Sequence, residues 1–167
     1  VDASINSISI GKGANSVAGN TVLGESALDA AVTGGNNTAI GKNALTANTS
    51  GASNTAVGYL AAASITTGAE NTAVGYNALD ATTTGGNNVA IGREALGSNT
   101  TASSNTAIGD VALYANTTGD SNTAIGGNAL DSNTTADNNT AVGRHALGAT
   151  TTGASNTAVG KSALAAN

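Results

Sequence analysis

The sequence contains no cysteine, proline, methionine, tryptophan or phenylalanine, and its only aromatic residues are three tyrosines. Without cysteine the chain can form neither a disulfide framework nor a thiolate metal site. Charged residues make up 9% of the chain, and the net charge is −5. With only five Lys and Arg residues to meet phosphates, a nucleic-acid partner is not expected. No apolar run approaches the ~20 residues of a membrane-spanning helix, so no membrane insertion is expected.

Large apolar side chains are also scarce, although 40% of the residues count as hydrophobic. Much of that fraction is alanine, which buries little surface and stabilises a core only weakly. Long hydrogen-bonded ladders or oligomerisation must therefore supply stability. A disordered spacer is one alternative for such a polar, glycine-rich chain, but its low charge and its fixed apolar positions count against that interpretation.

A repeat of 17 residues organises almost the whole chain. Each unit follows the pattern N-T-A-[IV]-G-x-x-A-L-x-x-x-T-T-G-x-x, whose residues we number as repeat positions 1 to 17. The Asn at position 1 is Asn20, Asn37, Asn54, Asn71, Asn88, Asn105, Asn122, Asn139 or Asn156. A fixed short period predicts a solenoid, in which identical coils stack and each covers its neighbour. We expect an all-β parallel β-roll, or β-solenoid, of about nine coils over residues 20–167.

Residues 1–19 do not follow the period and form an irregular leading segment. Ser7 to Gly11 matches the strand-Gly signature, but the next unit begins only 13 residues later. This spacing predicts one shorter coil before the regular array.

The pattern assigns a role to most repeat positions. Positions 2 to 4 read as a short strand whose side chains alternate between faces. We expect the aliphatic residue at position 4 to point into the coil and the small residue at position 3 to allow close approach of another strand. The Ala-Leu pair at positions 8 and 9 returns to the core, either as a second short strand or as one helical turn.

Two repeat positions predict structural ladders along the stack. A Gly at every position 5 indicates positive φ or backbone crowding, and stacked Asn side chains at position 1 can bond one another and turn backbone groups. The Asn ladder comprises Asn37, Asn54, Asn71, Asn88, Asn105, Asn122 and Asn139, and the Gly ladder comprises Gly41, Gly58, Gly75, Gly92, Gly109, Gly126 and Gly143.

Binding, if any, is expected at positions that vary while the framework repeats. Position 6 carries the basic residues Lys42, Arg93 and Arg144, spaced by 51 residues, and also Tyr59 and Tyr76. The 51-residue spacing fits growth by duplication of three-unit blocks, or a geometry in which every third coil meets the same neighbour. We take these five residues as candidate surface contacts.

The strand-turn motif resembles the head repeats of YadA-like trimeric autotransporter adhesins, through Asn88-Val89-Ala90-Ile91-Gly92-Arg93-Glu94-Ala95. The longer form from Asn71 to Leu79 is similar to repeats of bacteriophage tail fibres and other bacterial surface fibres. This resemblance implies a left-handed roll, a homotrimer with small residues facing the threefold axis, and an extracellular location on a virion or a bacterial surface. A host-cell receptor or glycan is the implied external partner. The repeat here is about three residues longer than adhesin-head repeats.

Nothing in the sequence predicts catalysis, so we expect a non-enzymatic structural or adhesive fibre segment without cofactor. His145 is the only histidine and falls in a turn, which leaves no soft-ligand metal cluster and no catalytic triad. Glycosylation sequons such as Asn99-Thr100-Thr101 arise from the repeat itself. The alternative function is ice binding by stacked Thr side chains at position 13, namely Thr49, Thr66, Thr83, Thr100, Thr117, Thr134 and Thr151.

Overall fold

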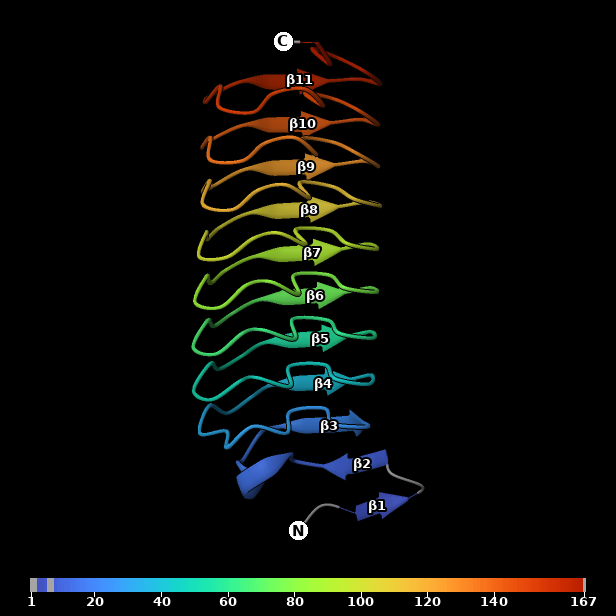
Figure 1. Cartoon of the computed structure of the whole chain (residues 1–167), viewed down its shortest axis with the longest axis vertical. Coiled ribbons are helices and arrows are strands. Elements are labelled where there is room, and N and C mark those ends of the chain that lie inside the picture. The colour runs from blue at the N-terminus through green and yellow to red at the C-terminus, as the bar shows by residue number, and fades with distance from the viewer. Residues whose placement is uncertain (1–2, 6–7, 167) are drawn as a thin grey trace.

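The computed structural model describes residues 3–5 and 8–166 and shows a rod of stacked coils (Figure 1). One strand from each repeat joins an 11-stranded sheet in which the strands follow in chain order. The nine strands β3 to β11 are parallel and complete about eight turns, so the predicted all-β parallel β-solenoid with 17-residue coils is confirmed. The strands are β3 (Thr21–Gly24), β4 (Thr38–Ile40), β5 (Thr55–Val57), β6 (Thr72–Val74), β7 (Val89–Ile91), β8 (Thr106–Ile108), β9 (Thr123–Ile125), β10 (Thr140–Val142) and β11 (Thr157–Val159).

Register in this sheet is set by the repeat itself. Thr55 pairs with Thr72, Ala56 with Ala73 and Val57 with Val74, and the other parallel pairs follow the same pattern. Every repeat position therefore lies directly above the same position of the preceding coil. At ~4.8 Å per rung, nine strands make a rod of roughly 40 Å.

The prediction that the position-4 aliphatics point inward is wrong. The position-3 residues fill the interior instead: Ala73 and Ala107 have 0% exposed surface, whereas Ile91 and Ile125 at position 4 are each 38% exposed. The coil is thin, and its interior already holds the Ala-Leu pair of positions 8 and 9. A close-packed interior of this width favours a methyl group from the strand over a larger side chain. Val22, at position 3 of the first coil, is the one larger residue that it accepts. The strands thus present Thr and an aliphatic residue on the outer face.

The Ala-Leu segment is neither a strand nor a helical turn but a pair of tight turns. Residues at positions 7 and 9 adopt left-handed backbone conformations, as at Asn77 (φ 52°) and Leu79 (φ 56°). This conformation turns the chain back on itself and directs Leu79 into the interior, where it is fully buried. Ala62 replaces Leu at position 9 in a single unit. That same coil carries Ile65 at position 12, where all the other coils except the first place Asn or Thr. Both side chains are buried, so the added volume of Ile65 compensates the small Ala62.

In place of the one shorter coil that the spacing predicts, the described part of the leading segment forms a hairpin. Strand β1 (Ala3–Ile5) pairs antiparallel with β2 (Ile8–Gly11), and β2 pairs antiparallel with β3. A short 3₁₀ turn, η1 (Ala14–Ser16), reverses the chain between β2 and β3. Ser7, the first residue of the predicted motif, lies outside the described residues.

Candidate functional site

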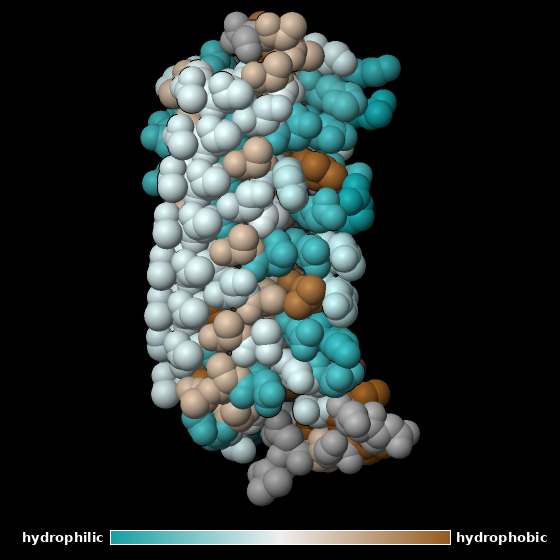
Figure 2. Space-filling model, in the orientation of Figure 1, coloured by the Kyte–Doolittle hydropathy of each residue, from teal (hydrophilic) through white to brown (hydrophobic). Residues whose placement is uncertain are grey.

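All five candidate contact residues lie on one long edge of the rod, which we call the turn edge. It consists of repeat positions 6 and 7, directly after the strand and its Gly. The arrows of β3 to β11 in Figure 1 point toward this edge, and Figure 2 shows hydrophilic residues gathered along it. The opposite edge, formed by positions 13 to 17, is mostly of intermediate hydropathy, with some hydrophilic residues toward the C-terminal end (Figure 2).

The Gly at position 5 ends each strand and sets the close spacing of the turns that form the turn edge. Gly75 has φ 138°, and a Cβ on it would lie 2.4 Å from the carbonyl oxygen of Gly92 in the next coil. The backbones therefore stack at a distance that only glycine permits. The turn that follows is held in register by backbone hydrogen bonds, such as Asn77 N–H to the Tyr59 carbonyl at 3.0 Å. Side chains at position 6 consequently form a single column.

Neighbouring side chains of this column interact in pairs. Lys42 Nζ lies 3.0 Å from Glu25 Oε1 of the preceding coil. The rings of Tyr59 and Tyr76 stack with centroids 5.6 Å apart. Arg93 bridges Asp110 of the next coil at 2.8 Å and Glu94 beside it at 2.9 Å. Two of the five candidates, Lys42 and Arg93, therefore pair with carboxylates, and Tyr59 and Tyr76 stack on each other.

Arg144, the fifth candidate, has no such partner among the described residues. Among the described residues, no carboxylate lies within ion-pair distance of Arg144 or of Lys161, which follows it at position 6 of the next coil. Gly127 occupies position 6 on the preceding coil, and a Cβ on it would meet only the Asp110 carbonyl oxygen, at 3.8 Å. His145 lies beside Arg144 at position 7, partly buried.

Two ionisable groups near this edge have shifted pKa values. The hydrogen bond that Arg93 donates to the Asp110 carboxylate holds the pKa of Arg93 above its ordinary value, so this guanidinium stays charged. Burial raises the pKa of the Asp80 carboxyl, and the negative charge of Glu94 adds to that increase against the lowering effect of backbone hydrogen bonds.

The position-1 Asn side chains lie inside the coil and not at its surface. Asn54 Oδ1 accepts the backbone N–H of Asn71 in the next coil at 3.0 Å, and Asn54 Nδ2 donates to the carbonyl of Gly68 at 2.9 Å. The same two bonds recur along the stack, and residues 37, 54, 71, 88, 105, 122 and 139 are all buried. These amides connect adjacent coils and are not available to a ligand.

A second buried ladder, at position 12, was missed by the sequence analysis. Asn133 Nδ2 donates to Asn116 Oδ1 at 2.9 Å, and Asn116 Nδ2 donates to Asn99 Oδ1 at 3.2 Å. The recurrence of Asn or Thr at position 12 was the available signal, but it was interpreted only as part of glycosylation sequons. Since Asn48, Asn99, Asn116 and Asn133 have 0% exposed surface, the folded chain cannot present them for glycosylation.

The Thr side chains at position 13 also serve the stack. Thr66 Oγ1 donates to the Thr83 carbonyl at 3.1 Å, and Thr100 Oγ1 donates to the Thr117 carbonyl at 3.0 Å. The equivalent bonds from Thr49, Thr83, Thr117 and Thr134 continue the column. These hydroxyls are therefore engaged within the rod, which weakens their candidacy as an ice-binding surface.

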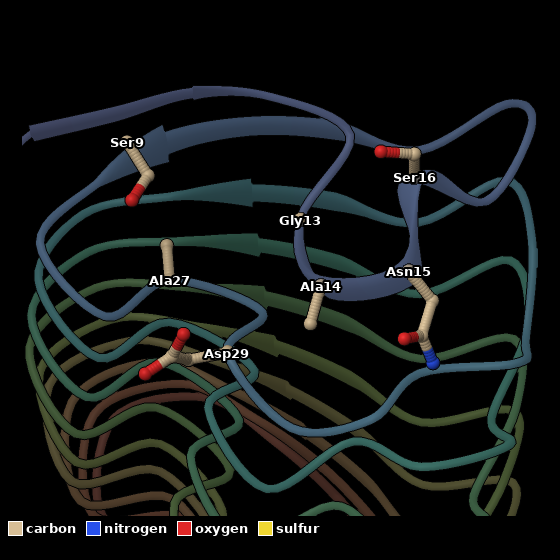
Figure 3. Close-up of a pocket in the computed structure, with 7 residues that line it drawn as sticks. All are labelled: Ser9, Gly13, Ala14, Asn15, Ser16, Ala27 and Asp29. Atoms are coloured by element: carbon tan, nitrogen blue, oxygen red, sulfur yellow. The ribbon is translucent and has the colours of Figure 1, made fainter. Parts of the chain in front are cut away.

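A cavity of about 300 Å³ lies at the hairpin end, between η1 and the first coil (Figure 3). Its lining is small and polar, with Ser9, Asn15, Ser16 and a single carboxylate from Asp29. Ligand pockets of this size are usually lined by apolar and aromatic side chains. The cavity thus marks incomplete closure of the first coil rather than a binding site built for a small molecule.

The described part of the chain contains no group of three His, Cys, Asp or Glu residues placed to hold a metal ion. Within the same residues, no helix has the length and apolar character needed to cross a membrane. No protein-family model, curated protein or solved structure matches this chain.

Proposed function

We propose that this chain is a non-enzymatic structural and adhesive rod that assembles side by side as a homotrimer. The observation that carries the proposal is the outer face of the sheet, where an aliphatic residue recurs at position 4 on every coil beside Thr at position 2, which Val89 replaces once. Leu23 is 44% exposed there, and Ile91 and Ile125 are 38% exposed. An extracellular fibre, on a bacteriophage tail or a bacterial surface, is the setting that a rod of this kind suits.

Parallel sheets are almost always covered on both faces. Here the inner face packs against the interior of the coil, and the outer face carries a continuous column of Ile, Val and Leu side chains. A second copy of the chain is the occupant that fits best, because its column has the same spacing of ~4.8 Å along the rod. Three copies would bury this column around a threefold axis and supply the burial that an alanine-rich coil lacks.

The test is the oligomeric state, measured by light scattering coupled to size-exclusion chromatography. We expect a mass about three times the 15.7 kDa of the chain. The double variant Ile91→Glu/Ile125→Glu should be monomeric, because two charges on each chain would be buried without partners. Val111→Glu/Leu60→Glu adds the same charge on the turn edge and should leave the mass unchanged. A monomeric wild-type chain would refute the trimer.

Ice binding is the second candidate, and the structure supplies a new surface for it. Position 2 places Thr38, Thr55 and Thr72 in register on the outer face of β4, β5 and β6, beside the aliphatic column. The arrows from β3 to β11 stay parallel along the stack, so this face is regular (Figure 1). Thermal hysteresis measured on wild type and on Thr55→Lys/Thr72→Lys distinguishes the candidates: a trimeric rod shows none in either sample.

A further inference from the structure

Two cations stand next to each other at the turn edge, on the rungs of β10 and β11. We propose that Arg144 and Lys161, with the open rung at Gly127, form a binding site for a polysaccharide that carries sulfate or phosphate esters. This inference deepens the proposed adhesive role and rests on it for its biological use. Binding itself requires only a single chain.

The coil geometry fixes the spacing of the two cations. Ser162 N–H donates to the Arg144 carbonyl at 2.8 Å, and His145 N–H donates to the Gly127 carbonyl at 3.1 Å. These bonds hold three successive turns in register, so the side chains at position 6 leave the rod on rungs ~4.8 Å apart. Both Arg144 and Lys161 are exposed.

The contrast with the rest of the column indicates an external ligand. Lys42 and Arg93 each have a carboxylate on a neighbouring coil at 3.0 Å or less. Arg144 and Lys161 instead repel each other, and an anion that bridges them would relieve that repulsion. The planar guanidinium suits the oxygen atoms of a sulfate or phosphate ester, and the ammonium adds a second point charge.

Gly127 adds a shape to this charge pattern. Because Gly127 has no side chain, the position-6 column has a gap between the side chains of Asp110 and Arg144. A sugar ring that follows the charged ester can lie against the backbone there. The nucleic-acid alternative is less favoured, because single-stranded binders stack bases on aromatic side chains. Position 6 offers its tyrosines only at Tyr59 and Tyr76, several coils away.

The experiment measures binding to four immobilised polymers at low ionic strength: dextran sulfate, poly(glycerol phosphate), neutral dextran and single-stranded oligo-dT. We expect wild type to bind dextran sulfate or poly(glycerol phosphate) and not neutral dextran. Arg144→Gln/Lys161→Gln should weaken that binding about tenfold or more. The matched control Lys42→Gln/Arg93→Gln removes the same two charges from the same repeat position and should change binding less than about threefold.

Three results would overturn the site. They are no binding of wild type to either anionic polysaccharide, equal losses in the two double variants, and tighter binding to oligo-dT than to both polysaccharides. Preference between dextran sulfate and poly(glycerol phosphate) distinguishes sulfate from phosphate esters as the source of the anion. Light scattering on the same samples reports the oligomeric state separately, so failure of the trimer and failure of the anion site give different results.

Discussion

Replacing Thr150 by Asn should stabilise the rod, because it extends the buried ladder at position 12 by one coil. In the present chain Asn133 Oδ1 and Thr150 Oγ1 are both buried and without a hydrogen-bond partner. The preceding coils show what an Asn does at this position. Asn133 Nδ2 donates both to Asn116 Oδ1 at 2.9 Å and to the Ala136 carbonyl at 3.1 Å. An Asn at 150 is placed to make the equivalent bonds to Asn133 Oδ1 and the Gly153 carbonyl.

The expected gain is about 2 kcal/mol, since each net hydrogen bond contributes ~1 kcal/mol and an unpaired buried acceptor costs ~1–3 kcal/mol. For a chain of this length that gain corresponds to a rise in Tm of roughly 4–8 °C. Thermal unfolding followed by circular dichroism measures it. Hydrogen exchange of the amides from β10 to β11 shows whether the stabilisation is local to these coils.

Thr82→Asn is the control for this prediction. Thr82 lies at the same repeat position but is already satisfied, since its Oγ1 donates to the Asn99 carbonyl and accepts from Asn99 Nδ2, both at 3.0 Å. Its preceding coil carries Ile65, which offers no acceptor. We therefore expect little or no gain from Thr82→Asn. A decrease in Tm for Thr150→Asn, or equal effects of both substitutions, would contradict the role assigned to the ladder.

Three further substitutions test the backbone of the coil. Gly75→Ala should lower the free energy of unfolding by about 3 kcal/mol or more, because its Cβ would meet the Gly92 carbonyl oxygen at 2.4 Å. Gly127→Ala should leave the free energy of unfolding nearly unchanged, because a Cβ there meets no close neighbour. Chemical denaturation of both variants measures the two free energies. Val111→Asn should raise the free energy of unfolding by ~1 kcal/mol, because a β-branched residue there adopts φ 58°, a conformation that Asn tolerates better. A loss of stability in Val111→Asn would show that packing of Val111 outweighs its backbone strain.

The period and the strand motif were sufficient to predict the parallel stack, because a repeat without insertions forces each coil to pair with the next in register. Alternation along Thr-Ala-Ile could define two faces but not which of them is inside. The sizes of the residues held the answer: position 3 is Ala in all units but one, as the narrow interior demands, whereas Leu, Ile and Val alternate freely at position 4. The turns at positions 7 to 9 were not predictable from period alone, since Leu rarely adopts the left-handed conformation seen at Leu79.

The turn edge was predicted as a set of variable residues, but the sequence could not show which of them interact. Glu25 and Lys42 are 17 residues apart, and only the register of the stack makes them neighbours. The same register separates Arg144 from any carboxylate in the described chain. The variable residues are therefore understood by comparing adjacent rungs of one column rather than residues adjacent in sequence.

The amides at position 1 give the rod a direction of growth. Asn37 uses its Oδ1 to accept the N–H of Asn54 and its Nδ2 to donate to the carbonyl of Gly51, both within the 17 residues that follow it. A finished coil thus displays the groups that the next 17 residues must satisfy. We therefore expect folding to proceed coil by coil from the N-terminal end during synthesis, with each formed coil setting the register of the next.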